Sequence, residues 1–401
     1  MVAQQYLVGA ATADITPSLD RPVYLAGFAP GRTARAVLHP LEVGVLYVAD
    51  EDGEELCLVT LDLIGIPRPW IVRIRQACGA TLPPERVVVA CTHTHSGPDT
   101  LGLWGKAFLG MIPLKSGVDP HYMETVVSRV AAAVSRARRN AATATLEAVT
   151  FDTPHGWVRN DRKGGGKYPR AVALAARSKG KLKTVLLNFG AHPETLWDKN
   201  RDVSPDYPAP CRDQLRQAGI DVPLFFTGPL GAMLTPDVTP KARLSARRRF
   251  IGRLGQMLAN QTLEQLEFSQ PVVGPIRLVE TPVVLPNMNP RFEFAKKRGL
   301  IDRPIENGQI RTSMAAGTIG NFQFVTVPGE PSPEVAHQVY AAMTGQHKAI
   351  LCLGLDELGY IIPASFFADR EYKYEKTMSV GPHTAPTVVS TTRTLMEKLT
   401  T

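Results

Sequence analysis

The sequence predicts an α/β fold in which mixed β-sheets are flanked by helices, in layers of the αββα type. Short apolar runs alternate with amphipathic stretches along the 401 residues, and strands that alternate with helices are typical of α/β domains. The stretches 145–158 and 274–285 are richer in β-forming residues, so we expect the sheets to be mixed or doubled. No repeat, low-complexity linker or domain boundary is evident, which predicts a single domain over 1–401.

Six apolar runs are predicted to be strands, and each delivers a polar residue where it ends. They are 58–61, followed by Asp62; 87–91, followed by two histidines; 184–189, followed by His192; 223–226, followed by Thr227; 322–327, followed by Glu330; and 349–353, followed by Tyr360. Ligand sites of open α/β folds lie at the carboxyl ends of their strands. The sequence therefore places the functional groups at one edge of the sheet.

Five stretches with an apolar face at helical spacing separate or follow these strands, and they predict helices over 68–77, 120–138, 208–218, 242–265 and 333–343. In the fourth of these we expect the arginines to form a solvated face, opposite a buried face. The arginines are 243, 247, 248, 249 and 253, and the buried side chains are Phe250, Ile251, Leu254 and Met257.

The segment Thr-His-Thr-His-Ser-Gly-Pro at 92–98 carries the strongest chemical signal. Two histidines two residues apart on a strand point to the same face, and the flanking turn formers mount them on a shaped loop. The plain alternative is a pair of loop histidines bonded to the backbone. Position after a buried strand favours a metal site.

Other strand ends supply partners for His93. A catalytic zinc site uses about three protein ligands and keeps an open position, and His93, His192 and Glu330 would form such a set from distant parts of the chain. Alone, each is a weak signal, because His192 before Pro193 could cap a turn and Glu330 could begin a helix. Together they predict a catalytic zinc centre.

Two other families with a His-x-His pair fit less well. A metallo-β-lactamase site requires His-x-His-x-Asp-His, whereas Gly97 and Pro98 occupy the last two places here. A TIM-barrel amidohydrolase has eight regular βα units, which the β-rich stretches do not match.

Composition excludes some functions. The net charge of +8 is spread along the chain, without the basic stripe and interleaved aromatics of a nucleic-acid-binding protein. We therefore expect no nucleic-acid partner. The positive charge could instead serve peripheral contact with an anionic membrane or the binding of acidic substrates.

The five cysteines form no Cys-x-x-Cys pair and are expected to be buried free thiols. As printed, the chain is expected to be cytoplasmic, or secreted or periplasmic if a signal peptide was removed.

Ordered motifs along nearly the whole chain resemble the neutral/alkaline (non-lysosomal) ceramidase family. The most specific are residues 92–98 and Val327-Pro328-Gly329-Glu330. Further matches are Val8-Gly9, residues 13–17 (Ala-Asp-Ile-Thr-Pro), Ala26-Gly27-Phe28, His39-Pro40-Leu41, Leu61-Asp62-Leu63, Ala191-His192-Pro193, residues 204–208 (Ser-Pro-Asp-Tyr-Pro), residues 358–361 (Leu-Gly-Tyr-Ile) and Tyr374-Glu375.

The resemblance implies a Zn²⁺ ion held by His93, His192, Glu330 and the phenol of Tyr360. It also implies catalytic roles for His95, which would orient water or the scissile carbonyl, and for Tyr374, which would donate to the developing oxyanion. An arginine beside an asparagine would contact the reaction centre; beside Asn160, Arg162 is preferred over Arg159. From the residues alone, Asp14, Asp62 and Asp206 are candidates to hold the histidines from behind.

Two features depart from the family pattern. The family's Gly-Asp/Asn-x-Ser-Pro segment is Gly231-Ala232-Met233-Leu234-Thr235-Pro236 here, and the chain ends soon after Tyr374 without the immunoglobulin-like C-terminal domain of longer ceramidases. The expected function is zinc-dependent hydrolysis of an N-acyl amide, ceramide or a ceramide-like lipid. The alternatives are an amidase or acyl-transfer enzyme for a soluble amide, and an inactive homologue that binds lipid or metal.

Overall fold

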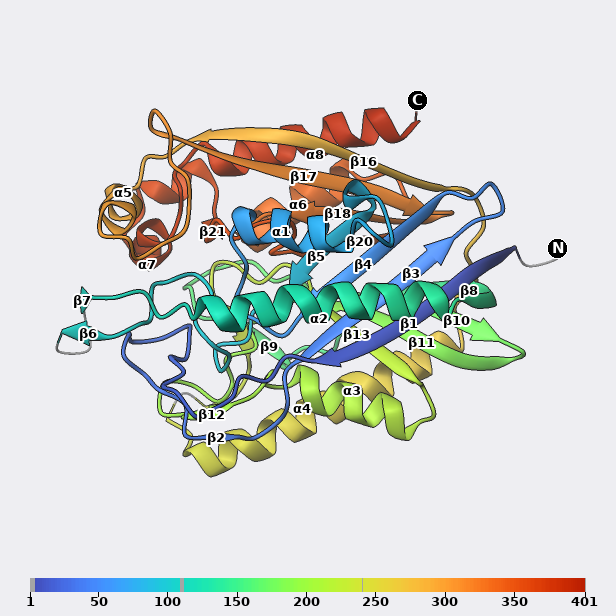
Figure 1. The fold of residues 1–401 in the computed structure, drawn as a ribbon, viewed down its shortest axis with the longest axis horizontal. Coiled ribbons are helices and arrows are strands. Elements are labelled where there is room, and N and C mark those ends of the chain that lie inside the picture. Colours follow the sequence, from blue (N-terminus) through green and yellow to red (C-terminus); the bar gives the residue numbers. More distant parts are fainter. Residues whose placement is uncertain (1–3, 109–111, 240, 401) are drawn as a thin grey trace.

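Two β-sheets form the centre of the computed structural model, which describes residues 4–108, 112–239 and 241–400 (Figure 1). The large sheet has nine strands in the order β13-β11-β10-β8-β1-β3-β4-β5, with β15 paired to β8. Its strands are β1 (Gln5–Asp14), β3 (Glu42–Ala49), β4 (Glu55–Leu61), β5 (Val87–Cys91), β8 (Ala142–Asp152), β10 (Arg170–Ser178), β11 (Lys181–Phe189), β13 (Val222–Thr227) and β15 (Gln270–Pro271).

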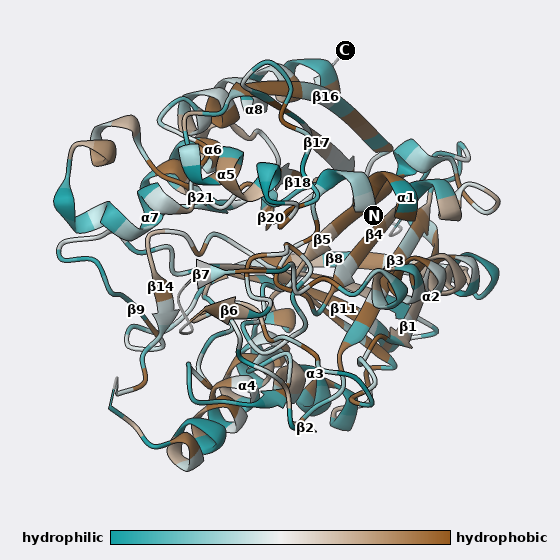
Figure 2. Cartoon of the chain, turned by 60° about the vertical axis from the view of Figure 1, so that its left-hand side comes forward, coloured by the Kyte–Doolittle hydropathy of each residue, from teal (hydrophilic) through white to brown (hydrophobic). Residues whose placement is uncertain are grey.

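The small sheet has the order β16-β17-β18-β20, with β16 (Ile276–Pro286), β17 (Gln309–Ile319), β18 (Phe322–Val327) and β20 (His347–Cys352). Both sheets are mixed: β4–β5, β11–β13 and β18–β20 are parallel pairs, whereas β1–β3 and β16–β17 are antiparallel. This confirms the predicted α/β class with mixed sheets. Apolar residues concentrate on the central strands, and hydrophilic residues gather on the outer helices and loops (Figure 2).

Helices cover the outer faces of the two sheets (Figure 1). Helix α8 packs against β16 and β17 of the small sheet, while α3 and α4 pack against β13, β8 and β10 of the large sheet, and α2 lies on β1 and β3. The helices are α1 (Arg68–Cys78), α2 (Pro120–Arg139), α3 (Pro208–Gln217), α4 (Leu244–Leu266), α5 (Pro290–Lys297), α6 (Pro333–Ala342), α7 (Lys373–Thr377) and α8 (Thr384–Thr400), and 3₁₀ turns span Pro84–Arg86, Ala364–Phe367 and Arg370–Tyr372.

Capping residues and proline explain where several helices begin. Asp119 accepts a hydrogen bond from the amide of His121 at 2.9 Å, and Pro120 occupies the first position of α2. Ser332 caps α6 in the same way before Pro333. A short polar side chain satisfies an amide that has no intrahelical partner, and proline at the first position loses no hydrogen bond.

The large sheet curves so that strands from its two halves meet. The hydroxyl of Thr60 on β4 donates to the carbonyl of Phe225 on β13 at 2.7 Å, although β13 is the first strand in the order and β4 the last but one. Gly44 on β3 lies against Leu224, where a Cβ atom would be 2.5 Å from the leucine side chain. The curvature brings the carboxyl ends of β4, β5, β11 and β13 toward one region.

Short strand pairs complete this region. β19 (Glu330–Pro331) pairs with β21 (Tyr360–Ile361), and β9 (Val158–Asn160) pairs with β14 (Leu234–Pro236). Two further pairs are β2 (Ala36–Val37) with β12 (Asp202–Val203), and β6 (Ala107–Phe108) with β7 (Ile112–Pro113). The first two pairs carry residues of the candidate site.

The predicted strands and helices all form, with ends within a few residues of the prediction. Two details of α4 were wrong: Arg247 is buried and donates to the carbonyl of Thr195 at 2.9 Å, and Met257 is 39% exposed. The five cysteines are buried free thiols, as predicted. Within the described ranges, no helix is both long and apolar enough to cross a membrane.

Candidate metal centre and active site

His93 occupies a strained turn directly after β5. Its φ angle is +71°, a left-handed conformation that costs an ordinary residue about 1–2 kcal/mol. The turn is held by hydrogen bonds from the amides of Thr92 and His93 to the carbonyls of Leu61 and Leu63, at 2.8 and 2.9 Å. Strained backbone that the surrounding structure enforces is typical of functional sites.

The two histidine motifs are joined through their backbones. The amide of His95 donates to the carbonyl of Pro193 at 3.1 Å, and the amide of His192 donates to the carbonyl of Leu234 at 2.9 Å. These bonds connect the ends of β5, β11 and β14, so three segments that are distant in sequence meet.

Backbone carbonyls orient two of the imidazoles. Nδ1 of His93 lies 2.6 Å from the carbonyl oxygen of Ile64, and Nδ1 of His192 lies 2.8 Å from that of Leu234. Because a carbonyl oxygen only accepts, each Nδ1 carries a hydrogen, and Nε2 is the nitrogen left to bind a proton or a metal. Both Nε2 atoms face one oxygen, Oε2 of Glu330, at 3.5 and 3.0 Å.

Glu330 reaches the histidines from β19, where it pairs in register with Tyr360 of β21. Its side chain is only 7% exposed. Burial disfavours the charged carboxylate, but the adjacent His93 and His192 outweigh this effect and lower the pKa of Glu330 below its usual range. The carboxylate of Glu330 is therefore anionic, and its Oε2 faces the two imidazole Nε2 atoms.

This donor set fits a metal ion. Two imidazole nitrogens and a carboxylate oxygen that face one another share either a proton or a metal cation, and imidazole nitrogen with carboxylate oxygen is a zinc-type ligand set. Two ligands of a tetrahedral zinc, each about 2.0–2.1 Å from the ion, are about 3.3 Å apart. The observed separations of 3.0 and 3.5 Å lie on either side of that value.

His95 completes a cluster of three buried histidines. Its ring centroid is 4.9 Å from that of His93 and 5.6 Å from that of His192, and the potential ligand nitrogens of the three rings lie within 4.8 Å of one another. Neither ring nitrogen of His95 has a hydrogen-bond partner in the described chain. Burial and the neighbouring histidines hold its pKa well below the usual value, so the ring is neutral and one of its nitrogens offers a lone pair.

Gly27 fixes the position of the His95 ring. A Cβ atom at residue 27 would lie 2.4 Å from Cγ and 2.5 Å from Nδ1 of that ring, and the φ angle of Gly27 is +101°. Only glycine meets both conditions without strain. Arg32 adds a clamp, because its guanidinium donates to the carbonyls of Ala26 and His95, both at 2.5 Å.

The structure places both tyrosines named by the sequence next to this cluster. Tyr360 is buried, its ring centroid is 6.3 Å from that of His192, and its hydroxyl contacts Sδ of Met233 at 3.3 Å. Burial and the Glu330 carboxylate raise the pKa of Tyr360 well above its usual value. The ring of Tyr374 lies 5.9 Å from that of Tyr360, and Tyr374 is 46% exposed.

Arg162 and Arg159 point to different surroundings. Nε of Arg162 lies 2.5 Å from Oε1 of the buried Glu375, which is the neighbour of Tyr374 in sequence. Arg159 is instead bound to Asp161 at 2.6 Å and to the carbonyl of Val238 at 2.6 Å. Of the two candidates, the structure brings Arg162 to the Tyr374 side of the site.

Backbone groups, not carboxylates, hold the metal-site histidines, so the three aspartates predicted for this role were wrong. Asp62 is bound to both terminal nitrogens of Arg212 at 3.0 and 2.6 Å, Asp206 accepts from the amides of Leu196 and Tyr207, and Asp14 accepts from the amide of Thr16. These aspartates shape the loops around the site without touching an imidazole nitrogen.

The sequence reasoning missed Glu194, two residues after His192. Its side chain is 2% exposed, Oε2 lies 3.5 Å from Nδ1 of His95, and burial raises the pKa of its carboxyl group. Oε1 has no hydrogen-bond partner in the described chain. The available signal was the order His192-Pro193-Glu194 after the end of β11, because it puts a carboxylate two residues from the proposed ligand His192.

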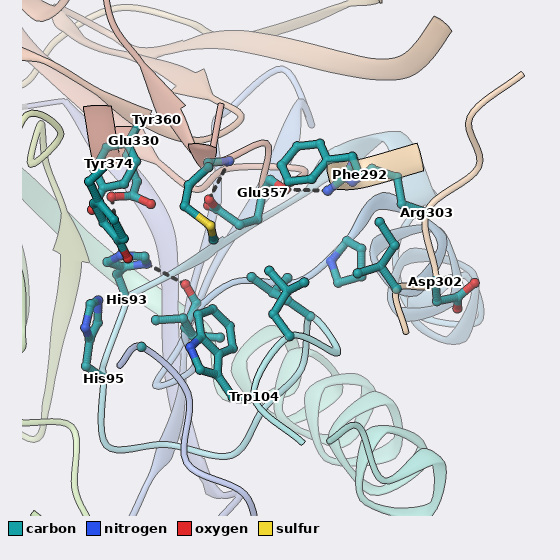
Figure 3. Close-up of a pocket in the computed structure, with 18 residues that line it drawn as sticks. His93, His95, Trp104, Phe292, Asp302, Arg303, Glu330, Glu357, Tyr360 and Tyr374 are labelled. Carbon is teal, nitrogen blue, oxygen red and sulfur yellow. Dashed lines mark hydrogen bonds and ion pairs between the residues drawn. The ribbon is translucent and has the colours of Figure 1, made fainter. Parts of the chain in front are cut away.

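An apolar cavity leads to the cluster, and we call it the inner cavity (Figure 3). It has a free volume of about 60 Å³, and its walls include His93, His95, Glu330, Tyr360, Tyr374, Glu357, Ile64, Leu101, Trp104, Phe292 and Ile301. The carboxylate of Asp99 supports one wall by accepting from the amides of Leu101, Gly102 and Trp104 at 3.0, 2.7 and 2.8 Å.

A larger opening, the outer groove, adjoins the inner cavity. It measures about 860 Å³ and shares Leu103, Trp104, Phe292, Tyr374 and Met378 with the inner cavity. Its remaining walls include Phe28, Pro30, Phe294, Leu300 and Arg162. The two spaces therefore lie side by side, and most of their walls are apolar.

The fold, but no close relative, is found by comparison with known proteins. A scan against protein families and a search of curated proteins found no match. Among solved structures, neutral ceramidase from Pseudomonas aeruginosa is similar with a TM-score of 0.80 and 18% sequence identity, over 100% of this chain and 75% of that chain. A structure described as ceramidase complexed with C2 gives a TM-score of 0.79 and 18% identity, over 99% of this chain and 76% of that chain. The chain therefore has a neutral ceramidase-like fold along its whole length, as its ordered motifs predict.

Proposed function

We propose that this chain is a zinc-dependent amidohydrolase that cleaves the amide bond of an N-acyl lipid, ceramide or a ceramide-like molecule. The observation that carries the proposal is the convergence of two imidazole Nε2 atoms on Glu330, at 3.0 and 3.5 Å, in the wall of a mostly apolar cavity. The similarity to ceramidase structures supports the choice of an amide as substrate.

His93, His192, Glu330 and Tyr360 would hold the metal. Zinc in such a site lowers the pKa of bound water from about 15.7 to about 7 and polarises a carbonyl. His95 is the group placed to take the proton of water, because its ring lies 4.9 Å from that of His93 and Glu194 lies behind Nδ1 at 3.5 Å. Pairing with Glu194 would stabilise the imidazolium that forms.

Tyr374 and Arg162 would act on the substrate carbonyl. Both line the outer groove beside the inner cavity, and Arg162 is kept in position by Glu375. A hydroxyl and a guanidinium aimed at the developing oxyanion would each stabilise the transition state by a few kcal/mol.

The outer groove favours a lipid over a soluble amide. Each methylene group that it removes from water contributes about 0.8 kcal/mol to binding, and its walls carry several aromatic and aliphatic side chains. The small inner cavity keeps a short, soluble amide as the second candidate.

Metal analysis combined with a substrate panel tests the proposal. The purified chain, loaded with Zn²⁺, is assayed on N-acyl sphingosines, N-acyl amino acids and short amides, and we expect hydrolysis of the first class. Activity on short amides alone would reject the lipid substrate and keep the mechanism. Zinc binding without turnover of any amide would favour the inactive homologue.

His93→Ala provides the matched variant. We expect it to lose both zinc and hydrolysis while it stays folded, and His155→Ala, which removes an exposed histidine, to keep both. Full zinc stoichiometry in His93→Ala would refute the ligand assignment.

A further inference from the structure

The inner cavity is small, and it extends from the histidines toward Phe292 and Asp302 (Figure 3). Its free volume of about 60 Å³ compares with about 860 Å³ for the outer groove. A cavity of about 150 Å³ in a protein core holds one benzene molecule. In proportion, the inner cavity has room for about two or three heavy atoms.

Two apolar residues, Leu101 and Ile301, line the inner cavity and not the outer groove. They belong to segments whose backbones are in contact, because a Cβ atom at Gly102 would lie 1.8 Å from the carbonyl oxygen of Leu300. Asp99 fixes the first segment by accepting from the amides of Leu101 and Gly102 at 3.0 and 2.7 Å. These two side chains therefore stand on a wall that is held from behind.

The rest of this wall is also fixed. The guanidinium of Arg303 anchors the second segment, because it binds both carboxylate oxygens of the buried Asp356 at 3.0 and 2.8 Å. Ile64 and Trp104, which line the same cavity, are only 1% and 7% exposed. Closely packed side chains do not move aside without loss of contacts, so the cavity cannot widen easily for a longer chain.

We propose that Leu101 and Ile301 limit one side of the substrate to about two or three heavy atoms beyond the amide group. This rests on the proposed amide hydrolysis, which places the amide carbonyl beside Tyr374, a residue that lines both spaces. Any longer chain then lies in the outer groove. A straight amide with a long chain at each end is excluded, and a substrate with two long chains must bind in a folded form.

Three ureas test this limit, because a urea has the planar carbonyl of an amide and resists hydrolysis. Each carries an octyl chain on one nitrogen, and methyl, propyl or hexyl on the other. Since a nitrogen flanks the carbonyl on both sides, the octyl chain can lie in the outer groove whichever part of an amide lies there. Binding to the full, zinc-loaded chain is measured by titration calorimetry and by tryptophan fluorescence, to which Trp104 contributes.

The order of the three affinities shows whether the cavity ends where we propose. A methylene group that leaves water strengthens binding about fourfold, so the propyl urea should bind about fifteenfold more tightly than the methyl urea. The hexyl urea should bind about ten- to a hundredfold more weakly than the propyl urea, because its chain overfills the cavity. In a cavity without this limit, it would bind more tightly by on the order of fiftyfold.

The variants are Leu101→Ala and Ile301→Ala, each of which removes as many carbon atoms from the wall as hexyl has beyond propyl. Either variant should reverse the order, so that the hexyl urea binds about tenfold more tightly than the propyl urea. Phe294→Ala is the control, because Phe294 is 52% exposed and lines only the outer groove. It should weaken all three ureas alike and keep their order. Circular dichroism checks the fold of each variant.

Tighter binding of the hexyl than of the propyl urea by the wild type, binding of none of the ureas, or the wild-type order in both cavity variants would overturn the inference. Because these affinities need no turnover, they can be read even if the chain hydrolyses no amide. Failure of the hydrolysis panel together with the expected order of the ureas would reject the proposed function and leave the size limit in place.

Discussion

Gly27→Ala should disable the site without changing any of its chemical groups. The added Cβ would lie 2.4 Å from Cγ of His95, about 1 Å closer than the 3.4 Å at which ordinary contact begins. The ring must therefore move by about 1 Å, and a displacement of that size costs on the order of a hundredfold in rate. The positive φ angle of residue 27 adds about 1–2 kcal/mol of backbone strain.

Gly53→Ala separates these two effects. Gly53 has a φ angle of +83°, and no atom lies within 4 Å of the position its Cβ would take. Gly53→Ala therefore introduces the backbone strain without a steric clash. Both variants should lose similar unfolding free energy from strain, and only Gly27→Ala should lose kcat/KM.

The assay measures kcat/KM on the best amide of the panel, zinc content, and the midpoint of urea unfolding for both variants. Low kcat/KM with full zinc content would assign His95 to proton transfer, whereas loss of zinc as well would make it a ligand. Equal kcat/KM in Gly27→Ala and Gly53→Ala would refute the conclusion that Gly27 positions His95.

Three further predictions follow from the site and the core. Arg162→Lys should lower kcat/KM about ten- to a hundredfold at unchanged zinc content. Arg159→Lys should not, because only Arg162 is bound to Glu375. Equal losses of kcat/KM in the two variants, measured by steady-state kinetics, would contradict this. Removal of zinc by a chelator should lower the thermal midpoint, and added Zn²⁺ should restore it, since a ligand that binds only the native state stabilises it; an unchanged midpoint would argue against the metal centre. Burial lowers the pKa of His347 in the folded chain, so the unfolded chain binds the extra proton and stability should fall as pH drops below about 6.5. The denaturant midpoints at pH 7.5 and pH 5.0 should therefore differ less in His347→Gln than in the wild type. An equal difference in the two proteins would contradict this.

The strands and their polar ends could be predicted because each carries its own local signal. β5 and β18 are short apolar runs, and His93, His192 and Glu330 follow strand ends, so the sequence alone indicates where they meet. Helix α2 shows its apolar face at regular spacing and begins with Asp119-Pro120.

Other features of the site and the core could not be predicted from the sequence, because their roles depend on contacts between distant segments. The bonds from Nδ1 of His93 and His192 go to backbone carbonyls, and every residue has a carbonyl, so no residue type marks them. Glu357 is an ordinary acid in sequence and is distinctive only because the fold buries it without a partner for Oε2. Arg247 lies among other arginines on α4, and only the loop at Thr195 makes it buried.

The use of carbonyls to orient the histidines bears on how this site tolerates sequence drift. A side-chain substitution at Ile64 or Leu234 leaves the acceptor in place, so these positions can vary in composition while the imidazoles keep their orientation. Leu234 lies in the segment 231–236, where Ala232 and Thr235 depart from the ceramidase pattern. The segment here also has one residue more between its glycine and its proline than that pattern, six residues against five, yet the carbonyl of Leu234 binds His192. In this segment, the site depends on the position of one backbone carbonyl and not on the side chains around it.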